Sequence, residues 1–370
     1  MKSDTMRPMR ILYGVVGEGM GHAMRSRVVL ERLFELGHEV EIVASGRAVD
    51  FLKKRFGDKS EVNRIHGMHI AYEDNQMRLA RTVLENVLAG TAAIPSQVAA
   101  YFDIIKDFKP ECVISDFESW TYFYAKRHGL PILSIDNMQV LNRTAIDDDV
   151  VEGHRAEFEI SKAFVKSKMP FANHYLITTF FFPPVRKENT TLIKPILRPE
   201  ILQAKRSEGG HLLVYQTAEG NDELARTLAS TGLECRIYGM RRSITSEQVE
   251  GNLRYRPFSE TTFIDDLASA KAVIAGGGFT LMGEAVYLHK PMLSVPVRGQ
   301  FEQVLNSRYL QKLGYGRYAE SLENPAEVHA FVERIPEHAR ALEGFIQEGN
   351  QGLYEALDVQ LDRVAAGLYG

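Results

Sequence analysis

The first half of the chain alternates between two spacings of its apolar residues. Short, nearly continuous apolar runs, as expected of buried strands, cover residues 10–16, 38–44, 111–115, 131–135 and 174–179. Between the first two runs, Val28, Leu33 and Phe34 recur at helical spacing, and Gly37 follows as a helix stop. Strands that alternate with helices of this length predict βαβ units around a parallel sheet.

The second half of the chain starts the same rhythm again. Strands are predicted at 211–216, 234–238, 253–256, 272–275 and 291–295, with helices between them and a helical tail from residue 325. A proline-containing stretch with few helical signals separates the halves, and 174–179 is expected to be the last strand before it. The fold class is therefore α/β, with two Rossmann-like parallel-sheet domains that face a central cleft. We expect domains at 1–195 and 196–345, and a C-terminal helix at 346–370 that packs back on the first domain.

Composition narrows the class of protein. The chain has 370 residues, 45% hydrophobic and 25% charged, which is ordinary for a globular protein of two domains. The net charge of −4 gives no basic field to recruit nucleic acid. Cys112 and Cys235 each lie in an apolar run and are expected to be buried thiols, so no disulfide framework argues for secretion. No signal peptide or run of about 20 apolar residues is present, and we expect a cytoplasmic protein.

A glycine-rich loop follows the first predicted strand, in the segment from Gly14 to His22. Such a loop lets a ligand approach the backbone, and the next helix offers its N-terminal amides to an anion. A dinucleotide-binding dehydrogenase has a similar loop but needs an acid at the end of its second strand. Here that strand ends at Ser45, and the glycine spacing differs from GxGxxG, so we set the dehydrogenase aside.

A second and more specific motif starts at residue 276. The strand AVIA is followed by Gly276, Gly277 and Gly278 and then by a helix, which aims backbone amides at a diphosphate. Glu284 lies further along that helix, where a carboxylate can accept hydrogen bonds from two ribose hydroxyls. A tight turn and a solvated helix residue are the simpler explanations of each feature alone. Their joint spacing favours a nucleotide site.

These motifs resemble those of nucleotide-sugar glycosyltransferases with two Rossmann domains, the GT-B architecture. The segments that carry the resemblance are GEGMGH at 17–22 and GGGFTLMGEA…KPMLSVPV…FEQ…N at 276–306. The chain looks similar to the bacterial N-acetylglucosaminyltransferase of peptidoglycan-precursor synthesis and to small-molecule glycosyltransferases. One difference is that the small-molecule branch usually has a histidine where Gly276 stands. Backbone amides, with His22 or Arg25, would then hold more of the diphosphate.

The resemblance implies an inverting hexosyl transfer from a UDP- or TDP-sugar, with the first domain binding the acceptor and the second the donor. The diphosphate, ribose, base and transferred sugar would be held by Gly21, Thr217, Phe258, Gly276, Gly277, Gly278, Phe279, Thr280, Glu284, Glu302 and Gln303. The donor is a substrate, so no cofactor is expected. No paired-acid metal motif stands out, and we predict a metal-independent reaction.

An inverting transfer needs a base for the acceptor hydroxyl and positive potential for the departing diphosphate. His22 is the candidate base, and Asp116 is its candidate partner. Asp116 follows the 111–115 strand and so lies at the same sheet edge as His22. Two alternatives stay open: Asp116 as the N-cap of the next helix, and His22 as a contact to the donor phosphates.

The acceptor side is specified less well. Residues that follow the strands of the first domain would line it, and the candidates are Met68, Tyr72, Phe117, Trp120 and Asn137. Their aromatic character suggests an apolar small molecule or a lipid, although core packing explains it equally. The segment 75–100 fits a buried amphipathic helix better than a membrane-surface helix, and a peripheral contact at the inner membrane face stays an alternative.

Two other functions share the predicted fold. A nucleotide-sugar 2-epimerase would need several acid–base groups around the sugar and no acceptor pocket. A non-catalytic nucleotide-sugar sensor would keep Glu284 and would not need His22. The pair Glu302 and Gln303 fits transfer better than epimerisation.

Overall fold

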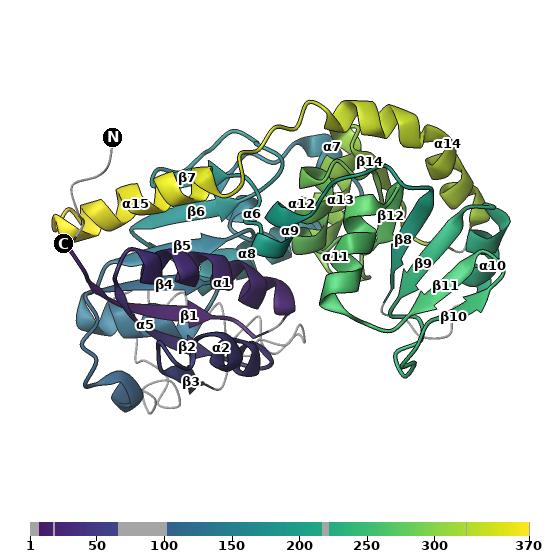
Figure 1. The fold of residues 1–370 in the computed structure, drawn as a ribbon. Coiled ribbons are helices and arrows are strands. Elements are labelled where there is room, and N and C mark those ends of the chain that lie inside the picture. The colour runs from purple at the N-terminus through teal and green to yellow at the C-terminus, as the bar shows by residue number, and fades with distance from the viewer. Residues whose placement is uncertain (1–6, 18, 66–101, 217–221, 323, 370) are drawn as a thin grey trace. The chain divides into compact units, whose positions relative to one another are not determined.

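A computed structural model describes residues 7–17, 19–65, 102–216, 222–322 and 324–369 (Figure 1). The chain divides into two compact units. The first holds 1–146, 155–196 and 350–370, and the second holds 147–154 and 197–349. The break at 196/197 lies close to the expected boundary at 195. Residues 147–154, which we expected in the first domain, belong to the second unit.

The first unit is built on a seven-stranded sheet in the order β3-β2-β1-β4-β5-β6-β7, in which all the pairings are parallel. Its strands are β1 (Arg10–Val15), β2 (Glu39–Ala44), β3 (Val62–Arg64), β4 (Cys112–Asp116), β5 (Ile132–Asp136), β6 (His174–Thr178) and β7 (Thr190–Ile193). Its helices are α1 (Met20–Glu35), α2 (Ala48–Phe56), α5 (Ser119–His128), α6 (Val140–Arg143), α8 (Arg155–Lys168) and α15 (Gln351–Ala365), with the 3₁₀ turn η1 (Phe102–Ile105).

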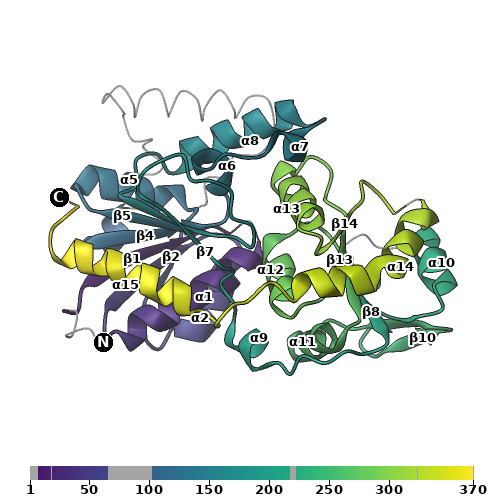
Figure 2. The ribbon, with the colours of Figure 1, turned by 90° about the horizontal axis from the view of Figure 1, so that it is seen from above.

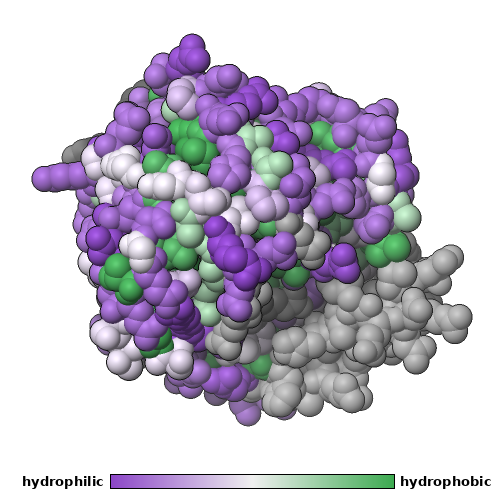
Figure 3. All heavy atoms as spheres, turned by 90° about the vertical axis from the view of Figure 1, so that its right-hand side faces the viewer, coloured by the Kyte–Doolittle hydropathy of each residue, from purple (hydrophilic) through white to green (hydrophobic). Residues whose placement is uncertain are grey.

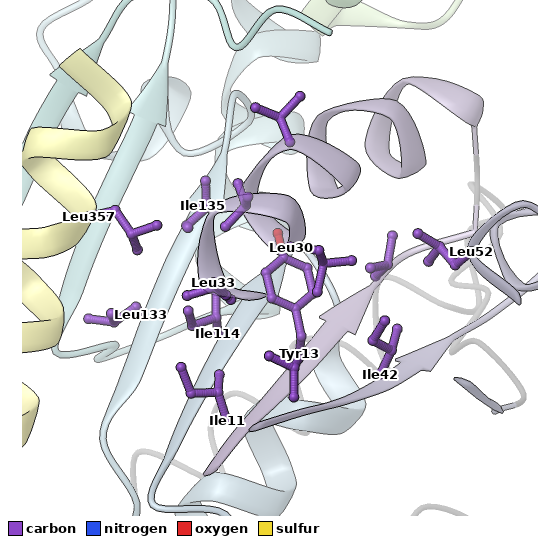
Figure 4. Close-up of a cluster of buried hydrophobic side chains, with 14 of the residues drawn as sticks. Ile11, Tyr13, Leu30, Leu33, Ile42, Leu52, Ile114, Leu133, Ile135 and Leu357 are labelled. Atoms are coloured by element: carbon purple, nitrogen blue, oxygen red, sulfur yellow. The ribbon is translucent and has the colours of Figure 1, made fainter. Parts of the chain in front are cut away.

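Side-chain alternation along β1 decides what covers each face of this sheet. Ile11 and Tyr13 point into a core that α1, α2 and α15 share, as Figure 4 shows with Leu30, Leu33 and Leu357. Gly14 points to the opposite face, where an added Cβ would lie 2.5 Å from the Oγ1 atom of Thr121 in α5. The C-terminal helix α15 therefore completes the core of the first unit and packs against β6 and β7 (Figure 1).

The second unit has its own seven-stranded sheet in the order β10-β11-β9-β8-β12-β13-β14, parallel except for the pair β10–β11. Its strands are β8 (His211–Tyr215), β9 (Glu234–Tyr238), β10 (Gln248–Glu250), β11 (Leu253–Arg256), β12 (Ala272–Ala275), β13 (Met292–Ser294) and β14 (Gly316–Tyr318). Its helices are α7 (Asp148–Val151), α9 (Pro199–Gln203), α10 (Asp222–Ser230), α11 (Glu260–Ser269), α12 (Phe279–Tyr287), α13 (Phe301–Lys312) and α14 (Pro325–Leu342).

The segment 147–154 joins the second unit through α13. The amine of Lys312 lies 2.9 Å from the carboxylate of Asp147 and 2.8 Å from that of Asp149. The guanidinium of Arg308 donates to the backbone carbonyls of Val150 and Glu152 at 3.1 and 2.5 Å. These contacts explain why 147–154 belongs to the second unit. The sequence did not predict this, because ion pairs between residues far apart in the chain do not affect the spacing of apolar residues.

One expectation about the strands is wrong. We expected 174–179 to be the last strand before the linker, but β7 follows it and forms the edge of the sheet. Thr190, Thr191 and Leu192 are only partly buried, so β7 lacks the apolar run of a central strand. Both cysteines are buried and free, as expected. The segment 75–100, which we expected to be a buried helix, lies outside the described residues.

The hydrophobic residues on the surface and in the helices bear on what membrane insertion requires. On the face in Figure 3, which carries α10, α14 and β10, hydrophobic residues are scattered among hydrophilic ones. Within the described ranges, no helix has the length and apolar character that crossing a membrane requires.

Candidate functional site

The first group of candidate residues lies at the carboxyl end of the central strands of the first unit. His22 stands in the first turn of α1, and Asp116 is the last residue of β4, next to β1 in the sheet. The Nδ1 atom of His22 lies 2.7 Å from Oδ1 of Asp116. The sequence placed these two residues at one sheet edge, and the structure brings them into hydrogen-bond contact.

Arg25 completes this group in a way that the sequence did not specify. Its guanidinium donates to both carboxylate oxygens of Asp116, from Nη2 at 2.5 Å and from Nε at 2.9 Å. Its Nη1 atom donates to the side-chain oxygen of Asn137 at 2.8 Å. Ser26 adds a further bond to Asp116 at 2.9 Å. His22 and Arg25 are one helical turn apart in α1, so both side chains face β4.

The protonation state of this group follows from its contacts. Burial by itself would raise the pKa of Asp116, but the charges and hydrogen bonds of Arg25 and His22 outweigh burial and lower the pKa to about 2. Asp116 is therefore an anion near neutral pH. A buried carboxylate favours an Nδ1–H donor on His22, which leaves Nε2 as the nitrogen with a free lone pair. His22 keeps 19% of its side-chain surface exposed, so the first unit does not fully enclose the ring.

The residue after Asp116 has an unusual backbone. Phe117 has φ of +56°, in the left-handed region that residues other than glycine rarely adopt. This turn lets Glu118 cap α5 by accepting a hydrogen bond from the backbone amide of Thr121 at 2.9 Å. Glu118 takes the N-cap role that was the alternative for Asp116, so the Asp116 carboxylate is left for His22 and Arg25.

The first glycine loop is held by Ser45, which stands where a dehydrogenase would have an acid. The Ser45 hydroxyl accepts a hydrogen bond from the amide of Gly17 at 2.9 Å. A Cβ at Gly17 would lie 2.1 Å from the Ser45 carbonyl oxygen, so this position needs glycine for packing. The N-cap of α1 is Gly19, with no side-chain cap and no acid in the first turn. The N-terminal amides of α1 thus have no side-chain cap at this edge.

The second group lies in the second unit, where β12 leads into α12. Gly278 is the N-cap of α12, again with no side-chain cap. An added Cβ at Gly278 would meet nothing within 4 Å, whereas one at Gly277 would lie 2.5 Å from the Gln303 backbone oxygen. Gly277 is therefore needed for packing against α13, while Gly278 keeps an open approach to the helix N-terminus.

Glu284 is the buried charge of this site. Its carboxylate forms a two-point ion pair with Arg198, whose Nε and Nη2 atoms lie 2.8 and 3.0 Å from its oxygens. Burial raises the pKa of Glu284, and Arg198 partly offsets that effect. Arg198 also donates to Glu260 at 2.7 Å. Ribose hydroxyls would have to use the remaining lone pairs of the Glu284 carboxylate.

Gln303 has a local structural partner as well. Its side-chain oxygen accepts from the amides of Gly277 at 3.2 Å and Val297 at 3.0 Å, and so fixes the glycine loop to α13. The carboxylate of Glu302 accepts from Asn306 at 2.7 Å. Both residues stand in the first turn of α13 beside the loop. Their expected contact with the sugar stays a prediction.

Seven further predicted residues fall into four groups. Phe258 is 73% exposed beside Phe263, which leaves one side free to stack on a base. Phe117 and Trp120 are each 2% exposed and pack on aromatic neighbours, and their expected contact with an acceptor stays a prediction. Asn137 is buried and engaged by Arg25. Met68, Tyr72 and Thr217 lie outside the described residues.

The sequence missed Arg198 and gave Arg25 only as a phosphate contact. Arg198 stands 86 residues before its partner Glu284, in a stretch that was expected to be linker. Within the described ranges, no group of three or more His, Cys, Asp or Glu side chains is placed to hold a metal ion.

Two Rossmann-like sheets, each with an uncapped helix N-terminus at a strand end, are the architecture of the GT-B fold, and similar solved structures have the same fold. A calicheamicin glycosyltransferase, CalG4, matches 97% of this chain and 100% of its own with a TM-score of 0.66 at 17% identity. MurG of Acinetobacter baumannii matches 95% and 99% with a TM-score of 0.62 at 16% identity.

The family model described as glycosyl transferase family 1 matches residues 9–336, and the chain belongs to that family. An uncharacterized glycosyltransferase of Methanosarcina mazei is 23% identical over 86% of this chain and 88% of its own length. A UDP-N-acetylglucosamine–N-acetylmuramyl-(pentapeptide) pyrophosphoryl-undecaprenol N-acetylglucosamine transferase of Bacillus cereus is 23% identical over 52% of this chain and 62% of its own. The protein is a glycosyltransferase with the GT-B fold.

Proposed function

We propose that this glycosyltransferase moves a sugar from a UDP- or TDP-sugar to a hydroxyl group of an apolar small molecule or a lipid, with inversion and without a metal ion. The donor class rests on one observation. In the second unit, an uncapped helix N-terminus at Gly278 precedes a buried carboxylate, Glu284, on the same helix. Amides at such an end suit a diphosphate, and the carboxylate suits ribose hydroxyls.

The chemistry of transfer is assigned to the first unit. His22 accepts the proton of the acceptor hydroxyl at Nε2 as that oxygen attacks the anomeric carbon. Asp116 holds the ring by its Nδ1 atom and stabilises the imidazolium that forms. The departing diphosphate is stabilised by backbone amides of the glycine loop, which supply positive potential in place of a metal.

The acceptor and the place of action are proposed from the relatives. The Bacillus cereus relative is named for transfer to a pyrophosphoryl-undecaprenol, and a structural neighbour, LpCGTa, was solved with UDP. These names support a UDP-sugar donor and a hydroxyl on an apolar or lipid-linked acceptor. We further propose that the protein acts in the cytoplasm, with peripheral contact at the inner membrane face where the acceptor is a lipid.

The test is a calorimetric titration of UDP- and TDP-sugars into the wild type, Glu284→Gln and Glu260→Gln. Glu260 is the other partner of Arg198 and is partly exposed, so its variant is a matched control. We expect binding of one donor to weaken about tenfold or more in Glu284→Gln and to change little in Glu260→Gln. Absence of binding by any donor, or equal loss in both variants, would contradict the donor site.

Turnover then separates transfer from the alternatives. A transferase releases nucleoside diphosphate only when an acceptor is present, whereas a 2-epimerase changes the sugar without an acceptor. A sensor shows no turnover, and its donor binding is unchanged in His22→Gln. We expect acceptor-dependent release that falls roughly 10²–10⁴-fold in His22→Gln.

A further inference from the structure

Five cationic side chains from three segments gather on the first unit, away from His22 and Asp116 in sequence. We call them the cationic cluster: Arg143 in α6, Lys162 and Lys166 in α8, and Arg186 and Lys187 in the loop between β6 and β7. The two α8 lysines are four residues apart and so share one face of the helix. α6 packs against α8, and Figure 2 shows these two helices side by side.

The third segment of the cluster is tied to α6 by two hydrogen bonds. The backbone amide of Arg186 donates to the carbonyl of Arg143 at 2.9 Å. The amine of Lys187 donates to the side-chain oxygen of Asn142 at 2.5 Å. Burial lowers the pKa of Lys187, and the charges of Arg143, Lys166, Lys162 and Arg186 lower it further. The fold thus holds like charges close together.

Arg143 is the buried member of the cluster and has only neutral partners. It is 8% exposed, and its Nε atom donates to the hydroxyl of Thr190 at 2.7 Å. Its Nη2 atom donates to the carbonyl of Glu188, and its guanidinium lies 3.7 Å from the ring centre of Tyr175. Within the described part of the chain, Nη1 makes no hydrogen bond.

The cluster differs from the other buried or partly buried arginines that the structure describes. Arg25 pairs with Asp116, Arg27 with Glu31 and the partly buried Arg198 with Glu284, each through a carboxylate that neutralises the charge. In the cluster, the described residues provide one ion pair, a contact of 3.5 Å between Lys162 and Glu159. A buried or crowded cation without a counter-charge is costly, and that cost is removed when an anion binds.

We propose that the cationic cluster is a binding site for a phosphoryl group, carried by a lipid headgroup or by a soluble phosphorylated ligand. Lysines supply flexible point charges, and an arginine supplies directed donors, which together suit several oxygens of one anion. Phe182 and Val185 are exposed in the same loop as Arg186, which gives a lipid source a place for apolar contact. The site is separate from the proposed donor loop and does not depend on sugar transfer.

The experiment compares the wild type with Lys166→Gln/Lys187→Gln and with Lys53→Gln/Lys54→Gln. The control removes the same charge from exposed positions in α2. Two probes are used: pyrophosphate by calorimetry, and phosphatidylcholine vesicles with and without phosphatidylglycerol by sedimentation. The glycine loop of the second unit is unchanged in all the variants, so any pyrophosphate that it binds contributes equally to each titration. A difference between the variants therefore reports on the cationic cluster.

We expect the cluster variant to lose about tenfold or more in affinity for at least one probe, while the control keeps its affinity. Loss for pyrophosphate alone identifies a soluble ligand, and loss for anionic vesicles identifies a lipid headgroup. Lys166 is exposed, so Lys166→Gln alone should fold normally, and a smaller loss is expected from it. Unchanged binding of both probes, or an equal loss in the control, would overturn the proposal. A failure of every nucleotide-sugar to bind would leave this result untouched.

Discussion

At the scale of single residues, Asp116 is a buried carboxylate that several side chains hold in place. It receives hydrogen bonds from Arg25, Ser26 and His22 while it is fully buried. Such a carboxylate stabilises the fold only while its partners are present, because an unpaired buried charge is strongly destabilising. The same residue therefore serves the stability of the first unit and, by our proposal, its chemistry.

Arg25→Met should destabilise the protein by about 3–5 kcal/mol, because it leaves Asp116 charged and unpaired. Asp116→Asn in the same chain should recover much of that loss, since the charge is then gone. Urea unfolding of the two single variants and the double variant measures this coupling. Arg55→Met, which removes an exposed ion pair with Glu31, should cost under about 1 kcal/mol. Strictly additive effects at 25 and 116 would show that the pair is not coupled.

The sequence predicted the contact of His22 with Asp116 because both follow neighbouring parallel strands. Arg25 was open to the same argument, since it lies one turn after His22 in α1. The contact of Arg198 with Glu284 could not be predicted in this way, because no local pattern relates an arginine to a glutamate 86 residues later. Pairing at that distance depends on the packing of a whole unit, which periodicity does not encode.

At the scale of elements, two neighbouring glycines in the turn from β12 into α12 have different surroundings. Gly277 is pressed against α13, and Gly278 faces open space. The sequence predicted one phosphate-binding loop and could not separate these roles, because glycine allows both.

Gly277→Ala should lower stability by about 1–3 kcal/mol, because its Cβ would lie 2.5 Å from a backbone oxygen that cannot move freely. Gly278→Ala should leave stability nearly unchanged, since φ is −64° and no atom lies near the new methyl group. Thermal unfolding of the two variants under the same conditions makes the comparison. Equal losses would mean that the contact between the loop and α13 is not as close as the structure has it.

Most central strands and long helices followed from apolar spacing, whereas the short edge strands did not. β3, β10 and β14 have three residues each, and β7 has four. Edge strands are covered on fewer sides, so they need no continuous apolar run. The pattern that predicts a strand measures burial rather than pairing, and it fails where pairing occurs without burial.

At the scale of the whole molecule, stability should depend on pH through Glu41. Burial, with repulsion from Glu61, raises the pKa of Glu41 to about 7 in the folded protein. The folded state thus holds this proton more tightly than the unfolded state, so stability is lost as pH rises from about 4.5 to about 7.

Glu41→Gln should remove that loss, because glutamine keeps an oxygen for the hydrogen bond from Asn63 and carries no charge. The variant should be more stable than the wild type by roughly 1–3 kcal/mol at pH 8, and the difference should shrink as the pH is lowered toward 5. Chemical unfolding at the two pH values measures it. Glu39→Gln, at an exposed position on the same strand, is the control and should show no such pH dependence. A difference that is constant with pH would assign the effect to packing instead.

The division of the chain into five alternating segments has a consequence for modular exchange among related transferases. A chimera joined at 196/197 would keep the host residues 147–154 and give them a foreign α13. The partners of Asp149 and Val150, which are Lys312 and Arg308, would then be replaced. The foreign tail after residue 349 would likewise bring its own helix to the host core in place of Leu353 and Leu357. A donor unit should therefore be transplanted as two pieces, 147–154 with 197–349, and the host should keep its own α15.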